Sequence, residues 1–258
     1  MSALTKMRLF SQALGMCVTV DILLPVRKDF TPNQKVPVLW LLHGATGCHS
    51  DWLRLTSVAR YAGTCGLAVV MPSAHNSSYT DMAHGQKFYT YISQELPETL
   101  PKMLNLSTCR EDNFIAGLSM GGAGSLMIGL SKPEQYAAIG CISAGAVNEE
   151  GSLHNGPRYA LNFGDGPTKN TYKDPLGCAQ TIVKKSLPCP RIYHACGASD
   201  FLLASAHKTR DFFQSLPGNP FDYTYVEHPG SHTWGFWDAH IQEFIDFLRL
   251  PQNSGEYI

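Results

Sequence analysis

Short apolar runs alternate with longer amphipathic stretches along most of this chain. Runs that suit buried strands span 36–42, 67–71, 113–116, 137–142, 191–196 and 221–226. Between them, the pattern predicts helices over 51–64, 88–106, 120–131, 204–216 and 233–250. Residues 16–23 alternate apolar and polar side chains, which is typical of a half-buried antiparallel strand near a sheet edge. Pro97 and Pro101 predict a kink or break inside the 88–106 helix.

This order of elements predicts an α/β fold with a mostly parallel central sheet flanked by helices. Strands separated by helices form βαβ units, and right-handed crossovers place the strand carboxyl ends at one edge, where functional loops gather. Residues 144–190 are rich in Gly, Asn, Pro and Lys and lack a strong strand pattern. We expect them to form a small excursion above the sheet, with short helices near Tyr159 and Ala179 and a role as a cap or pocket wall. We expect residues 1–258 to form a single domain.

Composition and charge exclude several classes of partner. The chain has 258 residues and a formal net charge of −1, without the basic stripe that binds nucleic acid. The longest apolar runs are far shorter than a membrane span, and Arg8 interrupts the apolar N-terminal stretch, so neither a membrane segment nor an export signal is expected.

The cysteines indicate the compartment. Eight of them are scattered without a C-x-x-C pair, and Cys17, Cys141 and Cys196 lie inside apolar strands. We therefore expect free, mostly buried thiols in a cytoplasmic protein. Whether the chain forms homo-oligomers is left open by the sequence.

The stretch 113–124 carries the strongest chemical signal. Residues 117–121, Gly-Leu-Ser-Met-Gly, fit G-x-S-x-G between a predicted strand and a predicted helix. Such a strand–turn–helix holds Ser119 in a strained conformation with its hydroxyl exposed, and side chains at Gly117 or Gly121 would collide across the turn. A phosphate-binding loop is the alternative, but it would need a P-loop lysine or G-x-G-x-x-G, and neither is present.

A serine nucleophile needs a base, and the base needs a group that orients it. In proteins with this elbow the order along the chain is Ser, then Asp or Glu, then His. His232 follows the last predicted strand and is the preferred base, with His228 as the runner-up. Asp200 follows strand 191–196 through a glycine turn and is the expected acid, although it also suits the N-cap of a helix that begins near Phe201. His194 lies inside a strand and is expected to be a packed core histidine.

The transition state of ester attack carries a negative oxygen, which two preorganised N–H groups usually bind. The expected donors are the backbone N–H groups of Met120, directly after the nucleophile, and of Ala45, in the loop after strand 36–42. Trp52, Tyr79 and Trp234 are the candidate pocket walls, although aromatic residues more often lie in a core.

Metals and cofactors are not expected. His228 and His232 lie four residues apart, but on a turn and without the glutamate of an H-E-x-x-H motif. No cofactor signature is present, and acyl transfer to serine needs none.

Taken together, these segments resemble the esterase D-like branch of the α/β-hydrolases, and within it the bacterial tributyrin esterases. The matching segments are LLHGATG at 41–47, VMP at 70–72, YTD at 79–81, ELP at 95–97, AGLSMGG at 116–122, CGASDFL at 196–202 and GSHTW at 230–234. The resemblance implies an α/β-hydrolase fold with Ser119, Asp200 and His232 as the triad. It also implies that the N–H groups of Ala45 and Met120 form the oxyanion hole.

The same resemblance implies a serine carboxylesterase that hydrolyses short-chain acyl esters of small molecules through an acyl-enzyme intermediate. The branch also holds acetyl and feruloyl esterases that act on plant polysaccharide fragments, S-formylglutathione hydrolases, and acyltransferases with the same triad. S-formylglutathione hydrolases typically carry Leu-Thr-Cys-Thr where residues 45–48 here are Ala-Thr-Gly-Cys, so a glutathione ester is less expected.

Overall fold

Eight strands form one mixed sheet in the order β1-β2-β4-β3-β5-β6-β7-β8. The structure is a computed structural model that describes residues 2–26, 34–146, 157–166 and 168–251. The strands are β1 (Ser2–Ser11), β2 (Met16–Pro25), β3 (Val38–Leu42), β4 (Ala68–Pro72), β5 (Asn113–Leu118), β6 (Ala138–Ile142), β7 (Arg191–Gly197) and β8 (Thr224–His228). β3 to β8 run parallel to one another, and β2 is antiparallel to both of its neighbours, β1 and β4. The predicted α/β sheet is therefore confirmed.

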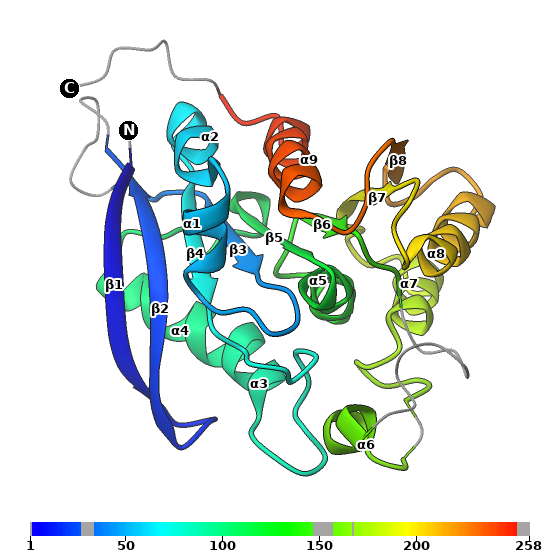
Figure 1. Cartoon of the computed structure of the whole chain (residues 1–258), viewed down its shortest axis with the longest axis horizontal. Helices are drawn as coiled ribbons and strands as arrows, with labels where there is room; N and C mark the ends of the chain where they lie inside the picture. The colour runs from blue at the N-terminus through cyan, green and yellow to red at the C-terminus, as the bar shows by residue number, and fades with distance from the viewer. Residues whose placement is uncertain (1, 27–33, 147–156, 167, 252–258) are drawn as a thin grey trace.

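Helices cover both faces of this sheet. They are α1 (Asp51–Leu55), α2 (Val58–Cys65), α3 (Phe88–Thr90), α4 (Leu96–Met103), α5 (Met120–Ser131), α6 (Pro157–Phe163), α7 (Pro175–Lys184), α8 (Leu203–Ser215) and α9 (Trp234–Phe247). Side chains of α1, α2 and α9 pack on one face, and those of α3, α4, α5, α7 and α8 pack on the other. Figure 1 shows α2 and α9 together on one side of the strands, with α4, α5 and α7 on the opposite side.

The central strands are apolar on both faces because each face has its own core. In β3, Val38, Trp40 and Leu42 belong to the core beneath α5, while Leu39 and Leu41 belong to the core beneath α9. All five side chains are at most 1% exposed. Strand side chains alternate between the two faces of a sheet, so a doubly covered strand requires an unbroken apolar run. That requirement explains the run at 36–42.

The N-terminal edge of the sheet differs from the prediction. β2 confirms the antiparallel strand predicted near the edge, but β1, which was not predicted, pairs with it along its whole length and forms the edge itself. β1 carries Lys6 and Arg8 among its exposed residues. Charged side chains are common on edge strands, where they discourage pairing with other chains, and they hide the strand pattern in a sequence.

Two predicted helices are interrupted. The 51–64 helix ends at Leu55 and restarts at Val58, because Thr56 is extended and its hydroxyl bonds back to the carbonyl of Trp52. The predicted break near Pro97 is a π-helical turn over Tyr91–Glu95 that continues into α4. Pro97 lies in the first turn of α4 and has no N–H to donate, which favours a wider turn before it.

The excursion contains both expected short helices, α6 around Tyr159 and α7 around Ala179, and residues 147–156 and 167 of it lie outside the described ranges. In Figure 1, α6 lies away from the sheet, beside the segment that follows β4. Asn162 of α6 makes this contact, since its amide donates to the carbonyl of Asn76 at 2.8 Å and to the hydroxyl of Ser78 at 2.9 Å.

All eight cysteines are free thiols, as predicted, but their burial differs from expectation. Cys65, Cys141 and Cys196 are buried, whereas Cys17 and Cys109 are exposed. Cys17 lies near the start of β2, and its face of the strand becomes buried only farther along, at Asp21 and Leu23. Among the described helices, none has the length and apolar character needed to span a bilayer.

Candidate active site

Ser119 lies on the sharp turn between β5 and α5. Its backbone has φ 53° and ψ −120°, a left-handed conformation that is rare outside glycine. The turn is tight because a Cβ at Gly117 would lie 2.5 Å from the backbone of Gly121, and one at Gly121 would lie 2.5 Å from the carbonyl oxygen of Leu42. The expected collisions are therefore present. The strained turn directs the serine hydroxyl away from the sheet edge.

Ser119, Asp200 and His232 come together at the carboxyl ends of β5, β7 and β8. The Nε2 of His232 lies 3.0 Å from the Ser119 Oγ, and its Nδ1 lies 2.9 Å from Asp200 Oδ2. The residues are 113 and 32 positions apart in the sequence, so only the sheet places them side by side. The arrangement suits removal of the serine proton by Nε2.

The imidazole of His232 is held between two aromatic rings. Trp237 contacts it edge-on, with ring centroids 5.0 Å apart, and Phe201 lies 4.4 Å away at a tilted angle. These contacts restrict rotation of the ring, so the two nitrogen atoms keep their separate partners.

Asp200 is an ionised acceptor in a buried position. Its side chain is fully buried, and Oδ1 also accepts the N–H of Leu202 at 2.9 Å. Burial raises the pKa of Asp200, but hydrogen bonds from His232, from the Leu202 N–H and from the Ser143 hydroxyl outweigh it and hold the pKa below its ordinary value. An ionised carboxylate can only accept, so the Nδ1 of His232 carries the proton and Nε2 is free to act as the base.

Asp200 does not cap the next helix as expected. α8 begins at Leu203, and Leu202 is its N-cap. The Asp200 side chain instead closes the short turn that precedes the helix.

Ser143 was not among the predicted site residues. It follows β6 at the same edge of the sheet, has φ 51°, and its N–H donates to the carbonyl of Ala195 at 2.7 Å. Its hydroxyl donates to Asp200 and accepts the indole N–H of Trp237 at 2.9 Å. The signal available in the sequence was its place directly after a predicted strand, which is also where Ser119 and Asp200 were found.

The loop after β3 lies against the elbow. Ala45 is exposed and Met120 is half-buried. A Cβ at Gly44 would lie 3.6 Å from the Cβ of Ser119, which places this loop beside the serine. Met120 opens α5, where first-turn N–H groups have no acceptor within the helix. Met120 directly follows Ser119 and Ala45 directly follows Gly44, so their role as oxyanion donors stays a prediction that these positions suit.

A network behind the loop fixes its shape. His43 is buried, its Nε2 accepts the N–H of Ala74 at 2.9 Å, and its Nδ1 donates to the Gly44 carbonyl at 2.7 Å. Burial lowers the pKa of His43, so the ring stays neutral and its nitrogen atoms keep these roles. The Tyr79 hydroxyl donates to the His43 carbonyl at 2.8 Å, and the Thr46 N–H donates to the side chain of Asn76 at 2.7 Å.

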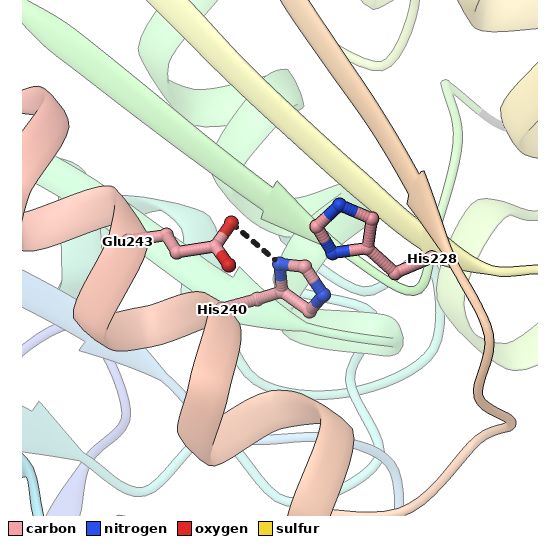
Figure 2. A group of neighbouring side chains, drawn as sticks. All are labelled: His228, His240 and Glu243. Atoms are coloured by element: carbon pink, nitrogen blue, oxygen red, sulfur yellow. Dashed lines mark hydrogen bonds and ion pairs between the residues drawn. The ribbon is translucent and has the colours of Figure 1, made fainter.

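The runner-up base, His228, lies elsewhere. Its ring lies beside His240 of α9, with centroids 5.3 Å apart (Figure 2). The position next to Ser119 is taken by His232. His194 is a packed core histidine, as predicted. It is fully buried, and it bonds to the Tyr223 hydroxyl at 2.7 Å and to the Ala144 carbonyl at 2.8 Å.

Comparison with known proteins identifies the family. The Esterase family model matches residues 11–247, nearly the whole chain. The chain belongs to the Esterase family. This membership confirms the resemblance to the esterase D-like branch of the α/β-hydrolases.

Two curated relatives show which esterases are similar. The acetyl esterase of Caldicellulosiruptor saccharolyticus is 28% identical over 263 residues, covering 95% of this chain and 98% of the relative. The S-formylglutathione hydrolase of Paracoccus denitrificans (strain Pd 1222) is 31% identical over 178 residues, covering 60% of this chain and 61% of the relative.

Two solved structures from Staphylococcus aureus match almost end to end. The fluorophosphonate-binding serine hydrolase FphF has a TM-score of 0.87 and 29% identity, covering 96% of this chain and 98% of its own. The S-formylglutathione hydrolase FrmB has a TM-score of 0.82 and 29% identity, covering 96% and 99%. The protein is thus a serine hydrolase that acts on carboxylic esters.

Two predicted pocket walls of this esterase are wrong. Tyr79 is 0% exposed and Trp52 is 1% exposed, so neither offers surface to a ligand. Tyr79 supports the loop of Ala45 from behind, and the indole of Trp52 donates to the Leu42 carbonyl at 3.0 Å. Both side chains lie in the core and donate hydrogen bonds to backbone carbonyls at the end of β3.

The third candidate, Trp234, is half-buried and meets Trp52 edge-on at 5.6 Å, so its role as a pocket wall stays a prediction. Phe201 was missed. It is 64% exposed and lies against His232, where it can contact a bound ester. The available signal was an aromatic residue directly after the predicted acid.

Proposed function

We propose that Ser119 is the nucleophile of this esterase, His232 its base and Asp200 the acid that orients the base. The single observation that carries the proposal is the unbroken chain of hydrogen bonds from Asp200 through His232 to Ser119. His232 takes the serine proton as Oγ attacks the ester carbonyl carbon. The histidine then gives that proton to the leaving alcohol. Water, activated by the same nitrogen, releases the acid from the acyl-enzyme and restores Ser119.

The N–H groups of Ala45 and Met120 receive the negative charge that develops on the carbonyl oxygen. Support comes from their position, because Ala45 follows Gly44, which lies beside Ser119, and Met120 is the first residue of α5 after Ser119. Donors fixed in advance stabilise the tetrahedral intermediate without reorganisation, and the network behind the loop provides that rigidity.

The substrates of the esterase are small-molecule esters with short acyl chains. The acetyl esterase relative, which aligns over nearly the whole chain, supports a small acyl group. We place the reaction in the cytoplasm, because eight free thiols are typical of a reducing compartment.

A panel of p-nitrophenyl esters with rising acyl length tests both parts of the proposal. We expect rates to peak at acetyl to butyryl esters, and Ser119→Ala to lower kcat roughly 10⁴-fold or more. Ser231→Ala is the control, since it removes a hydroxyl from the loop beside His232 and should keep most of the rate. Intact mass after fluorophosphonate treatment should show one adduct on the parent and none on Ser119→Ala.

Three outcomes would overturn parts of this proposal. A Ser119→Ala protein as active as the parent would remove the mechanism. A rate maximum at long acyl chains would remove the substrate class. Acyl transfer to an added alcohol that outruns hydrolysis would make the enzyme an acyltransferase.

S-formylglutathione hydrolysis is the second candidate function. The S-formylglutathione hydrolases of Paracoccus denitrificans and Staphylococcus aureus favour it, whereas residues 45–48, Ala-Thr-Gly-Cys, argue against it. Side-by-side kcat/KM values for S-formylglutathione and p-nitrophenyl acetate decide between them. We expect the oxygen ester to be preferred.

A further inference from the structure

Three side chains that take no part in ester hydrolysis converge where β8 meets α9. They are His228, at the end of β8, and His240 and Glu243, one turn apart on α9. One nitrogen or oxygen atom from each lies within 4.8 Å of the other two. Figure 2 shows the His228 ring and the Glu243 carboxylate on the same side of the His240 ring. In the sequence, His228 lies four residues before His232 and has no glutamate at metal-binding spacing, whereas the fold brings it close to Glu243 of α9.

The Nδ1 atom of His240 is hydrogen-bonded within this cluster. His240 Nδ1 lies 3.1 Å from Glu243 Oε2 and 2.8 Å from the Tyr193 hydroxyl, which itself donates to Glu243 Oε2 at 2.6 Å. The carboxylate and the tyrosine oxygen can only accept the Nδ1 proton, since the single tyrosine hydrogen is already given to Glu243. The Nδ1 hydrogen of His240 therefore lies where a cation bound between His240 and Glu243 would lie.

We propose that His228, His240 and Glu243 form a binding site for one divalent transition cation of the zinc class. Two imidazole nitrogens and one carboxylate oxygen are ligands that Zn²⁺ commonly takes. The cation replaces the proton on His240 Nδ1, which moves to Nε2, so the ring remains neutral. Three protein ligands leave the fourth position to water.

One ligand of the proposed site is held in place by packing, and the other two can move toward it. Bond lengths of about 2.1 Å put tetrahedral ligand atoms about 3.4 Å apart. His240 Nδ1 and Glu243 Oε2 are already 3.1 Å apart, and no pair of ligand atoms in the cluster is more than 4.8 Å apart, so the movement needed is at most about 1.4 Å. His240 is only 2% exposed and packs on Phe236, with ring centroids 4.0 Å apart. His228 is exposed and Glu243 is half-buried, so these two can move toward the fixed ring. Tyr193 keeps its hydrogen bond to Glu243 and orients that carboxylate.

The site lies next to the loop that carries His232. The His228 carbonyl accepts the N–H of Ala198, and the Gly230 carbonyl accepts the N–H of Ser199, both in the segment that leads to Asp200. A cation at this place ties β8 to α9 across the base of that loop. Binding is independent of the proposed hydrolysis, since none of the three ligands touches Ser119, Asp200 or His232 in the hydrogen bonds described above.

Calorimetric titration of the chelator-treated full chain with ZnCl₂ tests the proposal. We expect one Zn²⁺ per chain. His228→Ala and Glu243→Gln should each weaken the affinity roughly tenfold or more. Both residues reach the surface, so circular dichroism should show that the variants fold. His207→Ala is the matched control, because His207 also faces a carboxylate, Glu227 at 2.6 Å, but with no third ligand, and it should bind as the parent does.

Loading with Co²⁺ gives a second readout. Ligation by nitrogen and oxygen predicts visible d–d bands that disappear in His228→Ala. The proposal is overturned if the parent binds no Zn²⁺, or if His228→Ala and Glu243→Gln bind as tightly as His207→Ala. Strong thiolate-to-cobalt charge transfer would overturn it as well, since it would place the ion on the cysteines.

Discussion

The Ser143 hydroxyl fixes the direction of the carboxylate that lies behind the proposed base. It has one proton, which it gives to Asp200, while its lone pair accepts the indole N–H of Trp237. Because Trp237 also packs on His232, the same indole positions both partners of the Asp200–His232 hydrogen bond. Ser143 acts on the reaction only through Asp200, and is therefore a positioning residue.

Replacing Ser143 with alanine should lower kcat about tenfold and leave KM nearly unchanged. A hydrogen bond to a charged group contributes about 1.5 kcal/mol or more, and its loss weakens the hold on Asp200. Ser125→Ala is the matched control, since Ser125 is equally buried but bonds only to the carbonyls of Gly122 and Gly140. Steady-state kinetics and melting temperatures of both variants separate the two roles. Equal losses of kcat in the two variants would show that Ser143 is merely structural.

Residues that follow a strand could be predicted from the sequence, whereas residues that act through side-chain contacts could not. Ser119, Asp200 and His232 each follow a strand, in the order that the elbow implies, and the fold brings them together. Tyr79 and Trp52 were misassigned because the burial of an aromatic ring depends on which distant segments pack against it. No local pattern encodes that packing.

At the scale of elements, the site depends on how closely α5 approaches β3. Gly121 lies in the first turn of α5, where a Cβ would lie 2.5 Å from the Leu42 carbonyl oxygen and 2.6 Å from that of His43. These atoms are backbone at the end of a buried strand, so they cannot move aside without disturbing the sheet.

Gly121→Ala should therefore destabilise the protein by roughly 2–3 kcal/mol and abolish most activity. Gly235→Ala tests the same substitution at the second residue of α9, where a Cβ would meet nothing within 4 Å. Alanine favours helix more than glycine, so this variant should be as stable as the parent or gain up to about 1 kcal/mol. Urea unfolding of the three proteins gives the comparison. A Gly121→Ala midpoint no lower than that of Gly235→Ala would contradict the tight elbow.

Strands covered by helices on both faces could be predicted from the sequence, whereas the edge strand β1 and the π-helical turn could not. β3 to β7 are continuous apolar runs because helices cover both faces, and each was found near its true bounds. β1 was missed because its exposed positions mix charged Lys6 and Arg8 with apolar Leu4 and Phe10, so no regular alternation of apolar and polar residues marks it. The π-helical turn at Tyr91–Glu95 differs from a kink only in its hydrogen bonding, which the prolines suggest but do not specify.

At the scale of the whole molecule, a buried neutral histidine ties stability to pH. Burial lowers the pKa of His194 to about 4, whereas the group titrates near 6.5 when exposed. Between these values the unfolded chain binds a proton that the folded chain does not. Stability must therefore decrease as the pH falls from about 6.5 to about 4, and this contribution levels off below that.

Between pH 7 and pH 5, this one group should cost the parent roughly 2 kcal/mol of unfolding free energy. His194→Gln removes the titration and should show a smaller loss over the same interval, although it lowers stability at pH 7 by disrupting the bonds to Tyr223 and Ala144. His84→Gln, at an exposed position, is the control and should follow the parent. Urea unfolding at both pH values gives the difference. An identical loss in His194→Gln and the parent would rule out the assignment.

The loop that carries the proposed base, His232, follows an edge strand, β8, whose side chains are poorly buried. β8 has a single neighbour, β7, and none of its five residues is fully buried. Amide protons in such a strand exchange through local opening, which needs less free energy than global unfolding. When β8 detaches, the Asp200–His232–Ser119 alignment is lost while the rest of the sheet persists. We therefore expect mild heat or denaturant to inactivate the enzyme through local and reversible opening of this edge, before the rest of the sheet unfolds.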